Sequence, residues 1–325
     1  MKLSLHSERW PVARPFRITG HVWNSFDSIV VELEQDGVIG RGEGLGVFYL
    51  EETLDSMSAQ VEAVAKDVTA GLDRAALQRL LPPGGARNAL DCALWDLEAK
   101  RSRRSIWDLT GVTPKVLETV YTIGLEATPE AMAQHAAEST QYTLLKVKLD
   151  GQRPLDNIRA IRAARPDVRI VVDANQGWTF AQLKELAPAF ADAGVQMIEQ
   201  PLARGADEAL EGYRSPVPLG ADELCLHLGE LDVAARRSQI INIKIDKTGG
   251  LTHALELACA ARERGLGLMV GCMAGSSLAI APAFVVGCLA DLVDIDGPLL
   301  LRRDRIPGMA YARGQVEPPL PAVWG

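Results

Sequence analysis

The sequence predicts an α/β protein in which a parallel (β/α) barrel follows a smaller α+β domain. After about residue 116, eight short apolar runs alternate with amphipathic helical segments, and the charged residues ending six of them recur roughly every 25 positions. The first hundred or so residues lack this alternation and combine hairpin and helix signals instead. An open doubly wound sheet is less favoured, because no GxGxxG turn follows the first strand.

In the N-terminal region, two strands and two helices are expected in chain order. The strands cover residues 27–34 and 38–42, and the turn signal Asp36-Gly37 joins them. One helix is expected over residues 53–70, and a second begins after Pro82-Pro83 with apolar side chains at helical spacing. Together these elements form a capping domain over residues 1–114, with a mobile loop at about 19–27.

The barrel is expected over residues 115–306, and residues 307–325 form a proline-rich segment that returns across the first domain. Each barrel strand is a short apolar run bounded by loop residues, which is typical of strands buried in a parallel sheet. The eight expected strands are 119–123, 144–149, 170–173, 196–199, 219–222, 241–245, 268–271 and 292–295.

Composition and charge exclude several classes of function. The formal net charge of −8 and the lack of a basic cluster argue against nucleic acid and anionic membranes as partners. The uncharged stretch 266–290 is long enough to span a bilayer, but glycines and a proline interrupt it, so a buried strand, turn and helix are expected. The five cysteines are odd in number and form no CxxC motif, which favours free thiols in a reducing cytoplasm.

Three acidic residues end successive strands of the predicted barrel. Asp173, Glu199 and Asp222 would stand side by side at the carboxyl-terminal mouth, where the sites of such barrels lie. Crowded carboxylates repel one another unless a cation joins them, and a hard ion such as Mg²⁺ prefers oxygen ligands. A single acid of this kind more often caps a helix or pairs with a lysine. Three acids in register favour a site for one Mg²⁺ ion instead.

Two lysines are expected on opposite walls of the same mouth. Lys148 lies on the second predicted strand and Lys244 on the sixth, nearly opposite in an eight-stranded ring. A lysine near a divalent cation and another lysine loses affinity for its proton and can act as a base. Two such bases could remove a proton beside a carboxylate on one face and return it on the other. Lys146 shares the face of Lys148, whereas Lys247 is interpreted as a loop cation.

These motifs together resemble the enolase superfamily in its muconate-lactonizing subgroup. The strand-end sequences KxK, DAN, EQP, ADE and NIK match as a set, and the resemblance covers nearly the whole chain. It implies a (β/α)7β-type modified TIM barrel with an N-terminal α+β capping domain. Lysine bases acting with Mg²⁺ are a known property of this superfamily. The resemblance implies Lys148 and Lys244 as the acid/base pair and Lys146 as a cationic helper near the bound carboxylate or enediolate.

The pair Asp294 and Asp296 resembles the DxD signature of dipeptide epimerases, and the segments 144–150 and 242–250 are similar to L-Ala-D/L-Glu epimerases. Two carboxylates opposite the metal suit the free ammonium of a dipeptide. The resemblance implies an isomerase, of the racemases and epimerases acting on amino acid derivatives. It would invert the α-carbon of the C-terminal residue through a metal-stabilised enediolate. Alternatively, the two acids form a buried pair that caps the barrel floor or bonds to Arg302 or Arg303.

The expected capping loop departs from what a glutamate side chain needs. In this family, side-chain specificity comes partly from that loop, yet residues 19–27 contain no arginine or lysine. His21 would be a cation only when protonated, and Trp23 and Phe26 indicate an apolar or aromatic wall. We expect these three residues and Thr122 to contact the substrate. The preferred substrate stays open between L-Ala-D/L-Glu and a hydrophobic or cationic dipeptide.

Two rival functions remain at this point. A cycloisomerase or an o-succinylbenzoate synthase would use the same metal and lysines, but its substrate has no ammonium for Asp294 and Asp296 to bind. A non-catalytic dipeptide-binding or structural barrel is less favoured, because so many components of one site agree. A cytoplasmic dipeptide epimerase could serve peptidoglycan recycling or general peptide breakdown. A homo-oligomer is compatible with the sequence.

Overall fold

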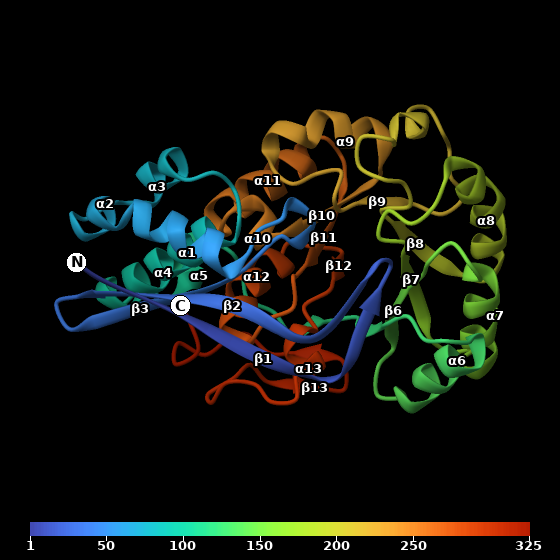
Figure 1. The fold of residues 1–325 in the computed structure, drawn as a ribbon, viewed down its shortest axis with the longest axis horizontal. Helices are drawn as coiled ribbons and strands as arrows, with labels where there is room; N and C mark the ends of the chain where they lie inside the picture. Colours follow the sequence, from blue (N-terminus) through green and yellow to red (C-terminus); the bar gives the residue numbers. More distant parts are fainter.

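The computed structural model describes residues 1–325 and combines an antiparallel sheet and its helices with a ring of parallel strands (Figure 1). The antiparallel sheet consists of β1 (Lys2–Ile18), β2 (His21–Gln35) and β3 (Val38–Leu45), in that order. The helices of this N-terminal domain are α1 (Leu54–Ala63), α2 (Ala65–Thr69), α3 (Arg74–Leu80), α4 (Gly85–Ser102) and α5 (Ile106–Thr110). A 3₁₀ turn, η1 (Phe48–Leu50), follows β3.

Helix α4 packs directly on β3 because glycine residues remove the side chains between them. A Cβ atom added to Gly42 would lie 2.1 Å from the carbonyl oxygen of Ala89, and one added to Gly40 would lie 2.3 Å from that of Ala93. On the same face of the sheet, β2 contributes buried Ile29 to an apolar core shared with α1 and α4. This close packing holds α4 directly against the face of the sheet.

The expected strands 27–34 and 38–42 are confirmed within β2 and β3, but other expectations need correction. The helix expected over 53–70 is interrupted at Val64, and β1 was not predicted. The segment 19–27 is not a loop, because only Thr19 and Gly20 form the turn and residues 21–27 belong to β2. Ile18 pairs with His21, and Phe16 pairs with Trp23, so the backbone of this hairpin is hydrogen-bonded as a strand pair.

All eight expected barrel strands are confirmed, and they lie in chain order in one parallel sheet. They are β5 (Tyr121–Ile123), β6 (Leu144–Lys148), β7 (Arg169–Asp173), β8 (Val195–Glu199), β9 (Leu219–Ala221), β10 (Ile240–Lys244), β11 (Gly267–Gly271) and β12 (Leu292–Val293). At the seam between the first and last strands, the Val120 N–H donates to the Val293 carbonyl at 2.8 Å. The sheet therefore curls into the modified (β/α)7β barrel.

Helices cover the outside of this ring, as a parallel sheet requires (Figure 1). They are α6 (Pro129–Glu138), α7 (Pro154–Ala164), α8 (Phe180–Asp192), α9 (Leu231–Arg237), α11 (Leu251–Glu263) and α12 (Ser277–Gly287). The connection from β8 to β9 carries only a 3₁₀ turn, η2 (Glu208–Leu210), and another, η3 (Leu228–Glu230), precedes α9. Two short helices, α10 (Ile245–Thr248) and α13 (Gly297–Leu300), lie directly after the sixth strand and shortly after the eighth.

The uncharged stretch 266–290 forms β11 and α12, as expected, and every side chain of α12 is buried. No helix combines the length and the apolar character needed to cross a bilayer. The five cysteines form no disulfide.

The C-terminal residues contact both domains of the molecule. Strands β13 (Tyr311–Ala312) and β14 (Gln315–Val316) form a small sheet with β4 (Leu117–Glu118) beside the barrel. Beyond them the chain reaches α4, where the buried Trp324 indole N–H donates to the Cys92 carbonyl at 3.0 Å. The Gly325 N–H donates to Asp96 Oδ1 at 2.8 Å.

Two sets of buried polar contacts join the capping sheet and α4 to α10, the short helix directly after β10. The Arg87 guanidinium of α4 donates to the carbonyl oxygens of Thr248 at 2.6 Å and Gly249 at 3.0 Å. Asp246 Oδ1 accepts from the Leu45 N–H at 3.0 Å and from Asn88 Nδ2 at 2.7 Å. Because these groups are buried, their hydrogen bonds hold the cap at one position over the barrel mouth.

Candidate active site

The three acids expected to bind a metal meet at the barrel mouth. Asp173 and Glu199 end β7 and β8, and Asp222 directly follows β9. One carboxylate oxygen of each lies within 4.8 Å of those of the other two, and all three side chains are fully buried. Burial and the charge of Asp173 raise the pKa of Glu199 to about 7. Both effects disfavour a further negative charge in this buried cluster of carboxylates.

The donor set fits a hard divalent cation. Glu199 Oε1 accepts from Asn242 Nδ2 at 2.7 Å, which orients the carboxylate. Glu199 Oε2 lies 2.8 Å from Lys146 Nζ but in an orientation that makes no hydrogen bond, so this buried oxygen has an unused lone pair. Three carboxylate oxygens are a suitable ligand set for Mg²⁺ and leave coordination positions for water and a ligand.

Lysines from opposite walls of the barrel face the same space. Lys148 ends β6 and Lys244 ends β10, with three strands of the ring between them. Lys148 Nζ lies 2.7 Å from Asp173 Oδ2, and Lys244 Nζ lies 2.6 Å from Asp222 Oδ2. Both side chains line one cavity. Each amine therefore contacts one of the three acids.

The lysine expected to lose its proton easily instead holds it more tightly in this structure. Burial lowers the pKa of Lys244, but the carboxylate of Asp222 outweighs burial and raises the pKa above its ordinary value. The pKa of Lys146 is raised for the same reason by Asp294, Glu199 and Asp173. A lowered lysine pKa is expected where a cation bound by the acids shares their negative charge.

The DxD acids lie on the wall opposite the three crowded acids. Asp294 and Asp296 follow β12, which is four strands away from β8 in the ring. Asp294 Oδ2 lies 2.7 Å from Lys146 Nζ, and Asp296 Oδ2 accepts from the Thr122 N–H at 2.7 Å. Burial and the charge of Asp294 raise the pKa of Asp296 to about 7. Neither Arg302 nor Arg303 forms an ion pair with them.

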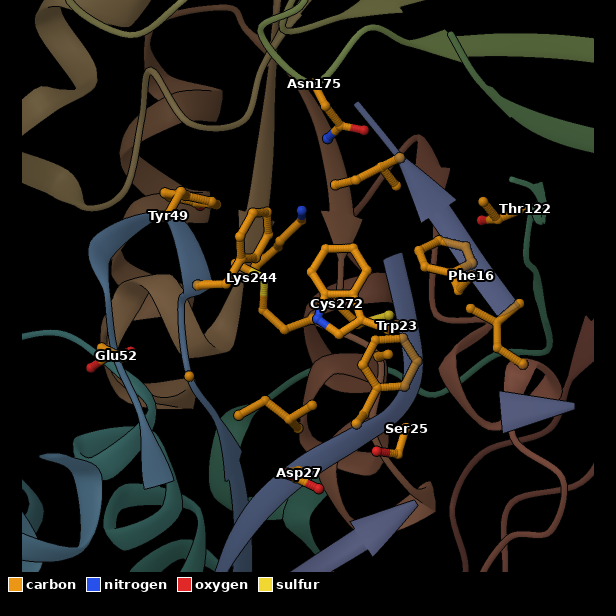
Figure 2. A pocket seen from close by; sticks show the side chains of 18 of the residues that line it. Phe16, Trp23, Ser25, Asp27, Tyr49, Glu52, Thr122, Asn175, Lys244 and Cys272 are labelled. Carbon is orange, nitrogen blue, oxygen red and sulfur yellow. The ribbon is translucent and has the colours of Figure 1, made fainter. Parts of the chain in front are cut away.

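A cavity of about 370 Å³ lies between the cap and the barrel mouth, and both domains line it (Figure 2). The barrel contributes the lysines of β6 and β10, the DxD acids and Thr122. The cap contributes Trp23 and Phe26, as expected from the sequence. His21 does not belong to the lining, because it lies exposed at the hairpin tip and stacks on Trp23 with ring centroids 5.4 Å apart.

The aromatic side chains of the cap form one continuous wall. The Trp23 ring centroid lies 6.2 Å from that of Phe16, 6.0 Å from that of Phe26 and 5.1 Å from that of Phe48. Phe48 in turn contacts Tyr49 with centroids 5.1 Å apart. All five residues line the cavity, so the wall faces the barrel lysines across it.

Three residues of the site were missed or misread from the sequence. Lys247 is not a loop cation, because its side chain is fully buried and its Nζ lies 2.6 Å from Asp222 Oδ1. Glu223 lines the cavity, and burial and Asp222 raise its pKa to about 8. Tyr49 also lines the cavity, and its hydroxyl is buried without a hydrogen-bond partner. The strand-end position of Glu223 could have identified it, but no local signal marks Tyr49.

Comparison with known proteins extends over nearly the whole chain. Residues 1–111 match the family of the mandelate racemase/muconate lactonizing enzyme N-terminal domain, and residues 130–316 match the enolase C-terminal domain-like family. The chain is 41% identical over 318 residues to the L-Ala-D/L-Glu epimerase of Escherichia coli, covering 97% of this chain and 99% of that protein.

Two solved structures share the same architecture. An enolase family member from Agrobacterium tumefaciens with homology to dipeptide epimerases, bound to sodium and L-Ala-L-Glu, has a TM-score of 0.97 and 40% identity, covering 99% of both chains. A dipeptide epimerase from Enterococcus faecalis, complexed with Mg and L-Leu-L-Tyr, has a TM-score of 0.89 and 25% identity, covering 98% of this chain and 96% of that one. The similarity therefore includes proteins bound to different dipeptides.

Proposed function

The chain belongs to the enolase superfamily, in its mandelate racemase/muconate lactonizing enzyme group, and on this premise we propose that it is a Mg²⁺-dependent dipeptide epimerase. The enzyme is an isomerase that inverts the α-carbon of the C-terminal residue of a dipeptide. The observation that carries the proposal is one cavity lined by the DxD acids and by a lysine from each of two opposite walls, with three crowded acids buried in contact with those lysines.

Asp173, Glu199 and Asp222 would hold the Mg²⁺ ion, one per site. A bound divalent cation neutralises charge on the substrate carboxylate, which lowers the barrier to removing the neighbouring proton. The dipeptide's ammonium lies against Asp294 and Asp296 on the far wall, where two carboxylates can accept its hydrogen bonds. A substrate stretched between these two groups of acids spans the cavity and brings its C-terminal α-carbon to the level of the lysines.

Lys148 and Lys244 exchange the α-proton. One lysine takes the proton from its face of the α-carbon, and the other, already protonated, gives a proton to the opposite face. After each turnover the two amines have exchanged protonation states, so the enzyme is left in the form that catalyses the reverse reaction. Proton exchange with solvent then restores the starting form. We expect the pKa of Lys244 to fall once a cation shares the charge of Asp222, which makes proton transfer possible near neutral pH.

The neighbouring residues support the transfer. Lys146, which contacts an acid of each group, adds positive charge beside the bound carboxylate. Asp294 and Asp296 disfavour the cycloisomerase and o-succinylbenzoate synthase alternatives, whose substrates carry no ammonium. The proposal includes a cytoplasmic role in peptidoglycan recycling or in general peptide breakdown, and the free state of the five cysteines agrees with a reducing compartment.

Deuterium exchange tests the proposal. The protein with Mg²⁺ is incubated in D₂O with a panel of L,L-dipeptides, and the α-deuterium content and configuration of the C-terminal residue are followed by mass spectrometry and NMR. We expect exchange with inversion for at least one dipeptide. Lys148→Ala and Lys244→Ala should each abolish inversion. Each variant should retain α-proton exchange with at most one epimer, because the remaining lysine reaches only one face of the α-carbon. Inversion in either variant would contradict the two-lysine assignment.

Lys184→Ala is the matched control for the two lysine variants. Lys184 lies exposed on α8 on the outside of the barrel, so its loss removes one charge without touching the cavity. Inversion should proceed at an unchanged rate in this variant. No exchange on any dipeptide by the unaltered protein would refute the epimerase proposal itself.

A further inference from the structure

We propose that the site selects dipeptides whose C-terminal residue carries a bulky, uncharged apolar or aromatic side chain, and that it discriminates against glutamate at that position. The inference rests on the proposed function, which places the reacting α-carbon between Lys148 and Lys244. The three crowded acids are buried at the ends of the barrel strands, whereas aromatic residues of the cap line the cavity that both lysines reach. The side chain on the α-carbon therefore has to extend towards the cap.

The cap presents an apolar surface to that side chain. Phe16, Trp23, Phe26 and Phe48 contact one another in a continuous wall, and Met57 and Met273 extend the apolar lining of the same cavity. Figure 2 shows the Trp23 and Phe16 rings reaching over the cavity between Lys244 and Thr122. An aromatic or branched aliphatic side chain gains from contact with such rings, since the contact removes apolar surface from water.

No arginine or lysine of the cap lines the cavity, so the wall offers no cation to a second substrate carboxylate. Arg9 forms a bidentate pair with Asp27, with N–O distances of 2.7 and 3.0 Å. Arg204 is held by the carboxylate of Glu230 and by the Glu223 carbonyl, and it does not line the cavity. The three lysines of the barrel each contact a site carboxylate. A glutamate side chain would therefore be buried without a partner, which is strongly unfavourable for an ionised carboxylate.

Acidic side chains at the cavity edge strengthen this discrimination. Asp27 and Glu52 both line the cavity; Asp27 is paired with Arg9, whereas Glu52 has no cationic partner and would repel a substrate carboxylate. They do not form a ready site for a lysine side chain either. Asp27 already has its bidentate partner, and Glu52 Oε2 accepts from the N–H groups of Val47 at 2.8 Å and Gly85 at 3.2 Å. This part of the cavity therefore disfavours a negatively charged substrate side chain, and it also lacks a free carboxylate that could pair with a positively charged one.

Overall similarity to known proteins would by itself predict a different substrate for this chain. The Escherichia coli relative is named L-Ala-D/L-Glu epimerase, and the Agrobacterium tumefaciens structure contains L-Ala-L-Glu. If overall similarity decided the substrate, glutamate would be preferred here too. The cap of this chain instead combines an aromatic wall with acids, and these residues decide which side chain is accepted.

Competition between matched dipeptides tests the inference. The protein with Mg²⁺ is given L-Ala-L-Phe, L-Ala-L-Leu, L-Ala-L-Glu and L-Ala-L-Lys in D₂O, and kcat/KM is obtained from α-deuterium incorporation for each. We expect L-Ala-L-Phe or L-Ala-L-Leu to exceed both charged dipeptides by roughly tenfold or more, the scale of selectivity that an apolar pocket provides. A value for L-Ala-L-Glu or L-Ala-L-Lys that equals or exceeds the apolar dipeptides would overturn the inference.

Binding measured by calorimetry with the same four dipeptides distinguishes this failure from failure of the proposed function. Tighter binding of the apolar dipeptides without any exchange would refute the epimerase activity and leave the selectivity standing. Tighter binding of L-Ala-L-Glu would overturn the selectivity whether or not exchange occurs.

Two variants of β2 make the test residue-specific. Ser25→Arg adds a cation to the cavity wall, and the ratio of kcat/KM for L-Ala-L-Glu to that for L-Ala-L-Phe should rise roughly tenfold. Asn24→Arg is the matched control, because Asn24 is the exposed neighbour of Ser25 and does not line the cavity. It should leave the ratio unchanged. An equal rise in both variants, or no rise in Ser25→Arg, would overturn the role assigned to the wall.

Discussion

Replacing Lys247 by methionine should destabilise the folded protein by about 4 kcal/mol, within the range for breaking a buried ion pair. The Lys247 side chain is fully buried, and its Nζ lies 2.6 Å from Asp222 Oδ1. It also donates to the carbonyl oxygens of Asp222, Asn242 and Cys225, at 2.7, 2.8 and 3.2 Å. Methionine fills nearly the same volume but makes none of these hydrogen bonds.

The expected magnitude combines two penalties that follow from these contacts. Burial acts against ionisation of Asp222, but Lys244 and Lys247 outweigh it and hold the pKa of this carboxyl well below its ordinary value. Without Lys247, Asp222 keeps only a fraction of this compensation. Each carbonyl left unpaired adds about 1–3 kcal/mol, although the penalties do not sum fully because the site can relax.

Urea unfolding without divalent cations measures this change, with the slope m compared between variants to confirm that the transition is the same. Lys2→Met is the matched control, because Lys2 pairs with Glu34 at the surface, where the two side chains are 73% and 42% exposed. That variant should change stability by less than about 1 kcal/mol. A loss for Lys247→Met no larger than the control's would refute the view that Lys247 is a structural partner of Asp222.

Three further predictions concern ionisation, metal binding and packing. Burial raises the pKa of Asp246 from 3.8 to about 7. Between these two pH values the folded protein holds a proton that the unfolded chain has released, so the free energy of unfolding should fall as pH rises through this interval. Asp246→Asn should reduce this slope in urea titrations at several pH values, and an unchanged slope would contradict the assignment. Adding Mg²⁺ at 100 times its Kd should stabilise the protein by about 2.7 kcal/mol, seen as a rise in Tm. The rise should disappear with EDTA and in Glu199→Ala, and its persistence in that variant would argue against the acidic ligand set. Trp324→Ala should cost about 3–5 kcal/mol in urea unfolding because the indole is fully buried. Leu320→Ala, at a side chain 64% exposed, should cost far less, and equal losses would refute the importance of the buried contact.

The barrel and its polar strand ends could be predicted because their signals are local. A buried strand needs a short apolar run, and the residue that ends it lies at the mouth whichever loop follows. Asp173, Glu199 and Asp222 therefore meet as expected, and so do the lysines of the second and sixth barrel strands. The strands β8 and β9 were predicted correctly although only a 3₁₀ turn, and no α-helix, connects them.

The cap was predicted less well because its structure depends on pairing between distant residues. Pro11 and Pro15 interrupt the alternation of β1, so the strand signal is weak. The pairing of β1 with β2, with an irregularity between Pro11 and Phe16, nevertheless extends the hairpin through His21. A segment that looks like a loop in isolation becomes a strand when a partner strand satisfies its backbone.

The sequence by itself determined the fold class, the metal-binding acids we propose and the lysines of the two walls. Only the tertiary structure decided that Lys247 is buried against Asp222, that Tyr49 lines the cavity and that the cap closes it with an aromatic wall. The physical reason is the range of the interactions. Periodicity and strand ends are properties of neighbouring residues, whereas burial, charge compensation and the lining of a cavity depend on residues brought together from distant segments of the chain.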